Sequence, residues 1–433
     1  MPKVIVMFCC CLSLLLSACG GSGVTPGSTI INSNATGLAN TSSGSNVMSV
    51  VVDGGVPSLV QQNSNFPVYL NGLFTSVKVC LPNSSQCQVI DHVLVDTGSV
   101  GLRLLSSSNG AGGELNLPLP AVTDGTSSVY ECTQFADGYS WGSVNRADVV
   151  LGGETAASVP VQVIGVNTGL IPGNCSNNST NNTAENTLST LQANGILGVG
   201  VFAEDCGPYG CTPNPYYDCS DVLCTTPLQT LPVSSQVSNP VNMLAQDNNG
   251  VLIQLPAIAA TGASSVSGEM LLGVNTQANN TLPSGTQVLT LDPGSGQLAS
   301  ATATGSSSTY TTAYTDSGTS VYELGTSLMP PCPQSSAGYG FSCPASTLNP
   351  VVTVTDTSAQ KASFAILLAN ASNLFNAAPN MAAFDDLAAP APNDSTLVLG
   401  LPFFFGRSVA SIINNNGNFV YAGRSYSGPL VAF

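Results

Sequence analysis

The sequence predicts an all-β protein, and three observations support this. Of the 433 residues, 43% are hydrophobic and only 7% are charged, so uncharged polar residues supply most of the polarity. The 44 glycines and 28 prolines favour many short strands joined by turns. Alternating apolar and polar stretches are frequent, whereas helical patterns are few. The length allows two domains or one large β domain.

The first segment, residues 1–18, predicts a lipoprotein signal peptide. A short basic start with Lys3 leads into an apolar stretch that ends in "LLLSAC". This ending resembles a bacterial lipobox, which implies cleavage before Cys19 and lipidation of its thiol. A signal peptide with an incidental cysteine is the alternative. Residues 19–50, rich in Gly, Ser, Thr and Asn, predict a flexible tether.

These features predict an exported bacterial lipoprotein, on the periplasmic side of the outer membrane or at the cell surface. Its lipid is expected to be its only contact with the membrane. The ten cysteines that follow Cys19 are an even number, which in an exported chain indicates disulfides. Cys80 with Cys87 and Cys332 with Cys343 are candidates for local bridges. The spacing of the cysteines in 206–224 differs from that of a zinc site, so a cross-linked loop is favoured.

Charge excludes several classes of function. Seven Lys and Arg against 23 Asp and Glu give a net charge of −16, so nucleic acid is not an expected partner. The single histidine, His92, excludes a multi-histidine metal site, and no metal or other cofactor is expected. Strand alternation places His92 on the same face as Asp96. A packed or edge position is favoured for His92, with an influence on Asp96 as the alternative.

From residue 51 onward the pattern is that of a β protein. Strands are expected within 66–81 and 88–96, and within 147–166 as two strands around a Gly-Gly turn. Helices are expected only within 187–194 and 239–248, and 365–375 is ambiguous between helix and strand.

One element of the first half recurs in the second. An apolar run leads into Asp96-Thr97-Gly98-Ser99, and a similar run leads into Asp316-Ser317-Gly318-Thr319-Ser320. A hydrophobic segment containing glycine follows each, "GILGVG" at 195–200 and "LVLGLPFFFG" at 397–406. The repetition predicts a duplicated lobe. We therefore expect an N-terminal β lobe over 51–255, with the first Asp loop, and a C-terminal β lobe over 256–433, with the second.

A single Asp-hydroxyl-Gly triplet is an ordinary turn, but a pair suggests chemistry. A buried carboxylate is costly unless it is hydrogen-bonded or shares a proton. If the lobes bring Asp96 and Asp316 together, one acid keeps a proton and the other becomes a base. A water molecule between them can then attack a carbonyl carbon by general acid–base catalysis. The hydroxyls of Thr97 and Ser317 suit a role in joining the loops, and Gly98 allows close approach.

Together these motifs resemble the pepsin-like aspartic peptidases, over roughly residues 65–425. The resemblance implies a bilobal pepsin-like fold, with two duplicated β lobes and a cleft between them. It further implies an endopeptidase of peptide or protein substrates, with Asp96 and Asp316 as catalytic residues. Thr97, Gly98, Ser99, Ser317, Gly318, Thr319 and Ser320 would support them.

The segment "FADGYSWGS" (135–143) is similar to the flap hairpin of that family. Phe135 takes the position where the family carries a tyrosine, and Tyr139 or Trp141 is the candidate to substitute for it. Arg103 takes the place of a tryptophan common in the family, and is expected either to pair with a carboxylate or to extend along the cleft edge. The insertion at 206–224 is expected to cover or reshape the cleft.

The stretches "CQVIDHVLVDTGSVGLRL" and "GLPFFFGRSV" also resemble an uncharacterised family of bacterial exported proteins, which would be a divergent branch. Three functions remain open. The favoured one is a membrane-anchored, monomeric aspartic endopeptidase that acts on exported proteins. The alternatives are a catalytically inactive protein that binds peptides or proteins in the same cleft, and a structural envelope lipoprotein.

Overall fold

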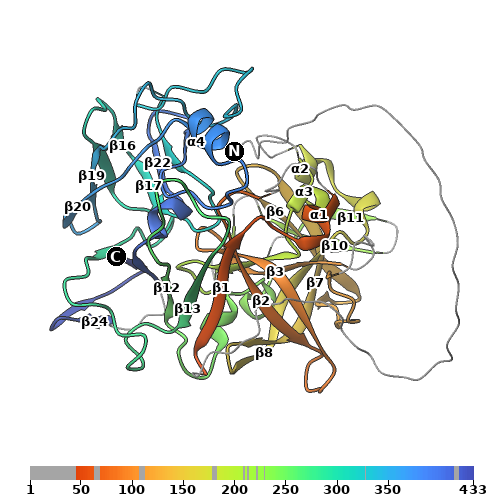
Figure 1. The fold of residues 1–433 in the computed structure, drawn as a ribbon. Coiled ribbons are helices and arrows are strands. Elements are labelled where there is room, and N and C mark those ends of the chain that lie inside the picture. Colours follow the sequence, from red (N-terminus) through yellow and green to blue (C-terminus); the bar gives the residue numbers. More distant parts are fainter. Residues whose placement is uncertain are drawn as a thin grey trace, which may run out of the picture.

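The computed structural model is all-β, with 42% strand and 10% helix (Figure 1). It describes residues 45–62, 69–106, 113–177, 183–207, 210–211, 214–220, 223–228, 230–326, 328–413 and 419–433. The expected signal peptide, Cys19 and most of the expected tether lie outside these residues. The tether is expected to reach residue 50, but residues 47–50 open the first strand, whose buried and partly exposed residues alternate and which pairs with a strand of the second half.

The strands of the first half are β1 (Val47–Asp53), β2 (Gly72–Cys80), β3 (Cys87–Asp96), β4 (Val100–Leu105), β5 (Thr123–Asp124), β6 (Ser127–Gln134), β7 (Tyr139–Leu151), β8 (Glu154–Ile164), β9 (Gly195–Val199), β10 (Tyr216–Cys219), β11 (Cys224–Pro227) and β12 (Gly250–Gln254). Those of the second half are β13 (Val266–Leu272), β14 (Val288–Thr290), β15 (Ser300–Ala303), β16 (Thr309–Tyr310), β17 (Thr312–Thr315), β18 (Tyr322–Leu324), β19 (Val351–Thr355), β20 (Lys361–Ala365), β21 (Ala388–Pro390), β22 (Thr396–Leu399), β23 (Ser408–Ile412), β24 (Phe419–Tyr421), β25 (Arg424–Tyr426) and β26 (Leu430–Ala432).

The helices are short. They are α1 (Pro57–Gln62), α2 (Gly173–Ser176), α3 (Leu188–Leu191) and α4 (Ala371–Ala377), with 3-10 turns η2 (Thr168–Leu170), η3 (Val233–Ser235), η4 (Pro240–Met243) and η5 (Leu401–Phe404). The helix expected within 187–194 is confirmed as α3, and the ambiguous segment 365–375 becomes helical only from Ala371. The helix expected within 239–248 is wrong, since only the turn η4 forms there.

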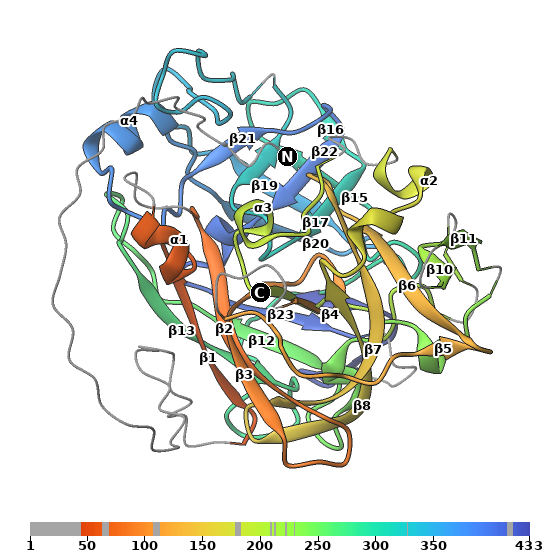
Figure 2. The same cartoon turned by 90° about the vertical axis from the view of Figure 1, so that its right-hand side faces the viewer.

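Six strands of the first half close into a barrel (Figure 2). The order β2–β3–β9–β4–β8–β7 returns to β2 through the pairing of β7 with β2. The expected Gly-Gly turn joins β7 to β8. Closure leaves no free edge, and the alternating aliphatic residues of these strands can pack in one core. Members of that core include Val79, Val93, Val95, Leu102, Leu104, Val149, Val161 and Leu197.

The two halves share a sheet, which continues from the barrel through β2–β1–β13–β12–β23–β26–β14. Val47 lies opposite Leu271, and Ile253 lies opposite Val409. The expected lobe boundary at 255 therefore separates β12 from β13, two strands that pair with each other. The strand β3 belongs to this shared sheet, whereas β17 belongs to a separate four-stranded sheet of order β17–β22–β18–β21.

The same local topology occurs twice. In the first half β9 runs parallel to β3 and antiparallel to β4, while β8 runs parallel to β4. In the second half β22 runs parallel to β17 and antiparallel to β18, while β21 runs parallel to β18. In each copy the turn that leaves the first strand carries one of the two Asp-hydroxyl-Gly triplets. The sequence repeat thus corresponds to a repeated strand arrangement.

Five disulfides cross-link the described chain: Cys80–Cys87, Cys132–Cys175, Cys206–Cys211, Cys219–Cys224 and Cys332–Cys343. Both pairs that sequence spacing suggested are confirmed, and the cysteines of 206–224 form two short loops. Such a number of bridges is typical of an oxidising, extracytoplasmic compartment. Among the described residues, no helix has the length and apolar character needed to cross a membrane.

Candidate functional site

The two acidic loops meet at one cavity. Asp96 ends β3 and Asp316 follows β17, and both line a cavity of about 500 Å³. Thr97, Gly98 and Ser99 line it as well. Walls come from both halves of the chain, including the β6–β7 hairpin and the segment 295–297. The structure therefore brings the two acids together, although 220 positions separate them in sequence.

Each acid is held by the same pair of donors. The backbone amide of Gly98 donates to Asp96 Oδ1 at 2.8 Å, and the Ser99 hydroxyl donates to Asp96 Oδ2 at 2.5 Å. In the second loop Gly318 donates to Asp316 Oδ1 at 2.8 Å and Thr319 to Asp316 Oδ2 at 2.6 Å. These bonds fix the orientation of both carboxyl groups and stabilise negative charge on them.

The contact between the loops requires glycine. A Cβ atom added at Gly98 would lie 2.6 Å from Cγ of Asp316, and one added at Gly318 would lie 2.7 Å from Oδ1 of Asp96. Each distance is well inside a normal van der Waals contact. Each glycine therefore leaves room for the carboxyl group of the other loop.

Two hydroxyls join the loops behind the acids, and we call this arrangement the hydroxyl lock. The amide of Ser317 donates to Thr97 Oγ1 at 2.9 Å, and the amide of Thr97 donates to Ser317 Oγ at 3.1 Å. The Ser317 hydroxyl also donates to the carbonyl oxygen of Val95 at 2.8 Å. Thr97 and Ser317 are both buried. Ser320 takes part only through its carbonyl oxygen, which accepts from Asn71 at 2.8 Å.

The carboxyl group of Asp96 affects the ionisation of Asp316. Burial raises the pKa of Asp316 well above its usual value, and the charge of Asp96 and a hydrogen bond to Asp96 raise it further. The donors Thr319 and Gly318 oppose this pKa rise without cancelling it. Two negative charges on carboxyl groups this close to each other repel, so the arrangement favours a proton on Asp316.

The hairpin formed by β6 and β7 extends over the cavity. Its tip is closed by a hydrogen bond from the Phe135 amide to the carbonyl oxygen of Gly138 at 2.8 Å, and Phe135 lines the cavity. Tyr139 and Trp141 do not line the cavity. Both are buried in an apolar cluster that includes the Cys132–Cys175 bridge. Neither side chain therefore reaches the cavity as the resemblance led us to expect, because alternation along β7 directs both into this cluster.

Arg103 pairs with a carboxylate, which was one of the two expected alternatives. It is only 1% exposed, and its Nη2 lies 2.8 Å from Oε1 of Glu131 in β6. Its Nε donates to Oγ1 of Thr133 at 2.9 Å. Arg103 thus connects β4, which directly follows the first acidic loop, with β6, the first strand of the β6–β7 hairpin.

Two lining residues and one neighbour of the cavity were not predicted as site residues. Asp205 lines the cavity just before the Cys206–Cys211 bridge, Tyr314 lines it two positions before Asp316, and Glu131 pairs with the lining residue Arg103. Alternation along β17 could have identified Tyr314, because it shares a strand face with Asp316. Asp205 and Glu131 carried no sequence signal. Their proximity depends on how the chain returns to the barrel after β9.

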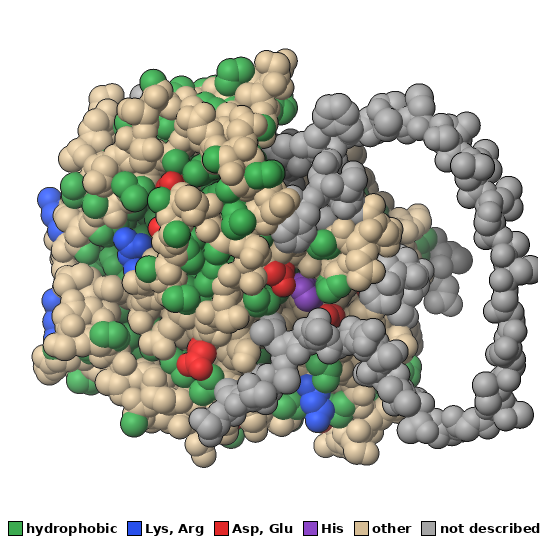
Figure 3. Space-filling model, viewed as in Figure 1, with side chains coloured by type: hydrophobic (Ala, Val, Ile, Leu, Met, Phe, Trp, Pro, Cys, Tyr) green, Lys and Arg blue, Asp and Glu red, His purple; other side chains and the backbone are tan. Residues whose placement is uncertain are grey.

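His92 does not contact the acidic pair. Its ring nitrogens lie 3.1 Å from Oδ2 of Asp91 and 3.3 Å from Oδ2 of Asp53, and Figure 3 shows the histidine among acidic side chains. Burial lowers the pKa of His92, but the two carboxylates outweigh this effect and raise the pKa to about 9. The alternation argument is wrong here, because His92 adopts a left-handed backbone conformation (φ 47°) at a break in the β2–β3 register.

A search of curated proteins gives no match to this chain. A family profile matches residues 42–433, a range that includes every residue that the structure describes. This result agrees with the expectation of an uncharacterised family, which rested on the stretches around the first acidic loop and around η5. The chain belongs to the family described as protein of unknown function (DUF3443).

Proposed function

We propose that this protein is an aspartic endopeptidase with a bilobal, pepsin-like fold. The observation that carries the proposal is the meeting of Asp96 and Asp316 at one cavity, each held by an equivalent amide and hydroxyl. The repeated strand arrangement around the two loops supports the fold. The size of the cavity is in the range of sites that bind small or extended ligands.

The geometry suggests a division of roles between the acids. Asp316, whose pKa is raised, would hold the proton and act as the general acid, and Asp96 would act as the general base. A water molecule bound between them would give a proton to Asp96 as it attacks the scissile carbonyl carbon. Asp316 would donate its proton to the carbonyl oxygen, which gives a gem-diol. Asp96 would then pass the proton taken from water to the leaving nitrogen while Asp316 takes back a proton from a diol hydroxyl, and the C–N bond breaks to give a carboxylic acid and an amine. No covalent intermediate is formed. The hydroxyl lock keeps the loops in register during this exchange.

We further propose that the protein is exported and anchored through a lipid on Cys19, at the periplasmic side of the outer membrane or at the cell surface. The five disulfides support an extracytoplasmic location. Its substrates would then be peptides or other exported proteins. Metabolic labelling with a fatty acid, compared between the native chain and Cys19→Ser, tests the anchor.

The activity is tested with casein and quenched fluorescent peptides between pH 3 and pH 5. We expect turnover that a transition-state-mimicking peptide inhibitor blocks. Asp96→Asn and Asp316→Asn should each lose activity by at least about 10³-fold, since each removes a proton acceptor or donor from the reaction. Ser320→Ala is the matched control and should retain activity. Equal turnover by Asp96→Asn and the native protein would refute the proposal.

A second candidate is a protein that binds peptides in the same cavity without cleaving them. The observation that favours it is Phe135, which presents no hydroxyl at the flap position. Binding of the peptide inhibitor without turnover of any peptide would support this second function over the first.

A further inference from the structure

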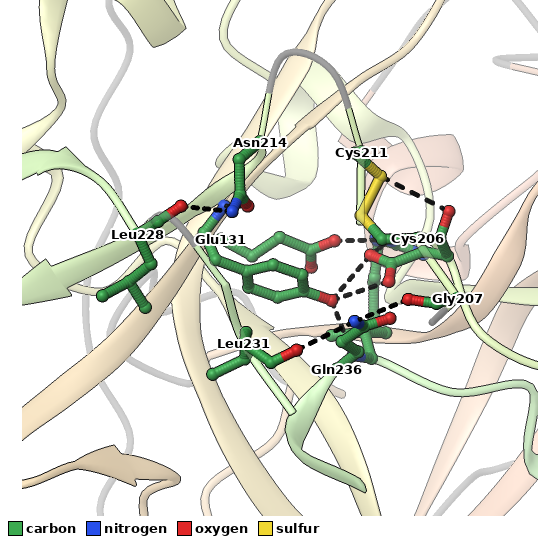
Figure 4. Close-up of a disulfide and its surroundings, with 12 residues drawn as sticks. Glu131, Cys206, Gly207, Cys211, Asn214, Leu228, Leu231 and Gln236 are labelled. Atoms are coloured by element: carbon green, nitrogen blue, oxygen red, sulfur yellow. Dashed lines mark hydrogen bonds and ion pairs between the residues drawn. A yellow bond between two sulfur atoms is a disulfide. The ribbon is translucent and has the colours of Figure 1, made fainter. Parts of the chain in front are cut away.

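A charged cluster lies beneath one end of the cavity. It consists of Arg103, Glu131, Asp205 and Tyr216, and we call it the Arg103 cluster. Nη2 of Arg103 lies 2.8 Å from Oε1 of Glu131 and 3.8 Å from Oδ2 of Asp205. The Tyr216 hydroxyl lies 2.7 Å from both carboxylate oxygens of Asp205. Figure 4 shows Glu131 close to the Cys206–Cys211 bridge that follows Asp205.

The cluster has one acid more than its single base can neutralise. Glu131 is fully buried, and its Oε2 has no hydrogen-bond partner among the described residues. The other donors of Arg103 are occupied by the hydroxyl of Thr133 and the carbonyl oxygen of Val100. Burial, together with the charge of Glu131, raises the pKa of Asp205 well above its usual value. The free protein therefore favours a proton in the cluster.

The cluster is accessible from the cavity that holds the catalytic pair. Asp205, Arg103 and Thr133 all line that cavity, and the side chain of Asp205 is 13% exposed. Among the described lining residues Arg103 is the only base. A ligand that enters this end of the cavity therefore meets Asp205, in a cluster that has two acids and only one base.

We propose that the Arg103 cluster is a subsite for the cationic side chain, Lys or Arg, of a peptide bound in the cavity. This role rests on the proposed function, because the ligand is the substrate itself. The incoming ammonium or guanidinium takes the place of the proton and donates hydrogen bonds to Asp205, while Glu131 adds to the negative field. An apolar side chain offers Asp205 neither a positive charge nor a hydrogen-bond donor and leaves the proton in place, which makes it the poorer ligand.

The protein's net charge of −16 attracts any cationic peptide, so a subsite must be distinguished from this general attraction. General attraction favours lysine at every position of a peptide. A subsite favours it at one. The probe is therefore a set of quenched peptides in which lysine or norleucine is placed in turn at each position on either side of the scissile bond. Reduced-bond analogues of the same peptides measure affinity without turnover.

We expect lysine to exceed norleucine by about tenfold or more at one position, in kcat/KM and in the affinity of the analogues. Asp205→Asn should remove this preference. Tyr216→Phe loses the hydroxyl that orients Asp205 and that accepts from the Val237 amide, and should reduce this preference. Glu204→Gln is the matched control. It removes a carboxyl group next to Asp205 in sequence, but the Glu204 side chain does not line the cavity, so this variant should keep both the rate and the lysine preference.

The outcomes separate the two proposals. If the native protein cleaves no peptide but its analogue affinities show the single-position lysine preference, the peptidase proposal fails and the subsite stands. If peptides are cleaved without a preference at any one position, the subsite is refuted and the peptidase stands. A preference retained in Asp205→Asn also refutes the subsite. If Asp205→Asn does not fold, an unchanged preference in Tyr216→Phe refutes it instead.

Discussion

The hydroxyl lock provides the sharpest test of how the two halves are held together. Ser317→Ala removes a hydroxyl that donates to the Val95 carbonyl oxygen and accepts from the Thr97 amide. The amide of Thr97 then remains buried without a partner, which costs about 1–3 kcal/mol. Loss of the bond to Val95 adds about 1 kcal/mol, because a carbonyl oxygen in a strand has other acceptor capacity. The total is about 2–4 kcal/mol.

Urea unfolding of the oxidised protein measures this loss. Trp141 is the only tryptophan, so its fluorescence reports the first half of the chain, while circular dichroism reports the whole. Ser320→Ala is the control, because Ser320 contributes only its carbonyl oxygen to a hydrogen bond. We expect the midpoint of Ser317→Ala to fall clearly below that of the control. Equal midpoints would show that the lock does not stabilise the fold.

Three further results are expected. Gly98→Ala places a Cβ atom 2.6 Å from Cγ of Asp316, and the roughly 1 Å displacement that this demands should lower peptide turnover by about 10²-fold or more while circular dichroism stays unchanged. His92 has a folded pKa of about 9 against 6.5 when unfolded, so it should stabilise the protein by about 3 kcal/mol below pH 6.5 and lose this as pH rises through 9. Unfolding of the native protein and His92→Asn from pH 6 to pH 10 should converge, and parallel curves would contradict this. Replacing Cys132 and Cys175 by serine removes a bridge of sequence separation 43 and should lower the free energy of unfolding by about 4 kcal/mol. An unchanged urea midpoint would show that the bridge does not constrain the unfolded chain.

Local patterns in the sequence were sufficient for the strands that carry the acids. Alternation and turn residues identified β3, β7 and β8, because both signals depend on neighbours within a few positions. They failed at His92, where a left-handed residue interrupts the alternation, and at the turn η4, where the apolar spacing resembles a helix. These failures have one cause. The period of a strand or helix is visible in sequence, but an irregularity imposed by a neighbouring strand is not.

The sequence by itself determined that two equivalent acidic turns end apolar strands, and that closely spaced cysteines pair. Only the tertiary structure decided what surrounds those turns. The contact of Thr97 with Ser317 spans 220 positions, and the approach of Arg103 to Asp205 depends on the closure of a six-stranded barrel. Contacts of this kind follow from sheet pairing and register, which arise from the whole chain, so no local pattern of residues encodes them.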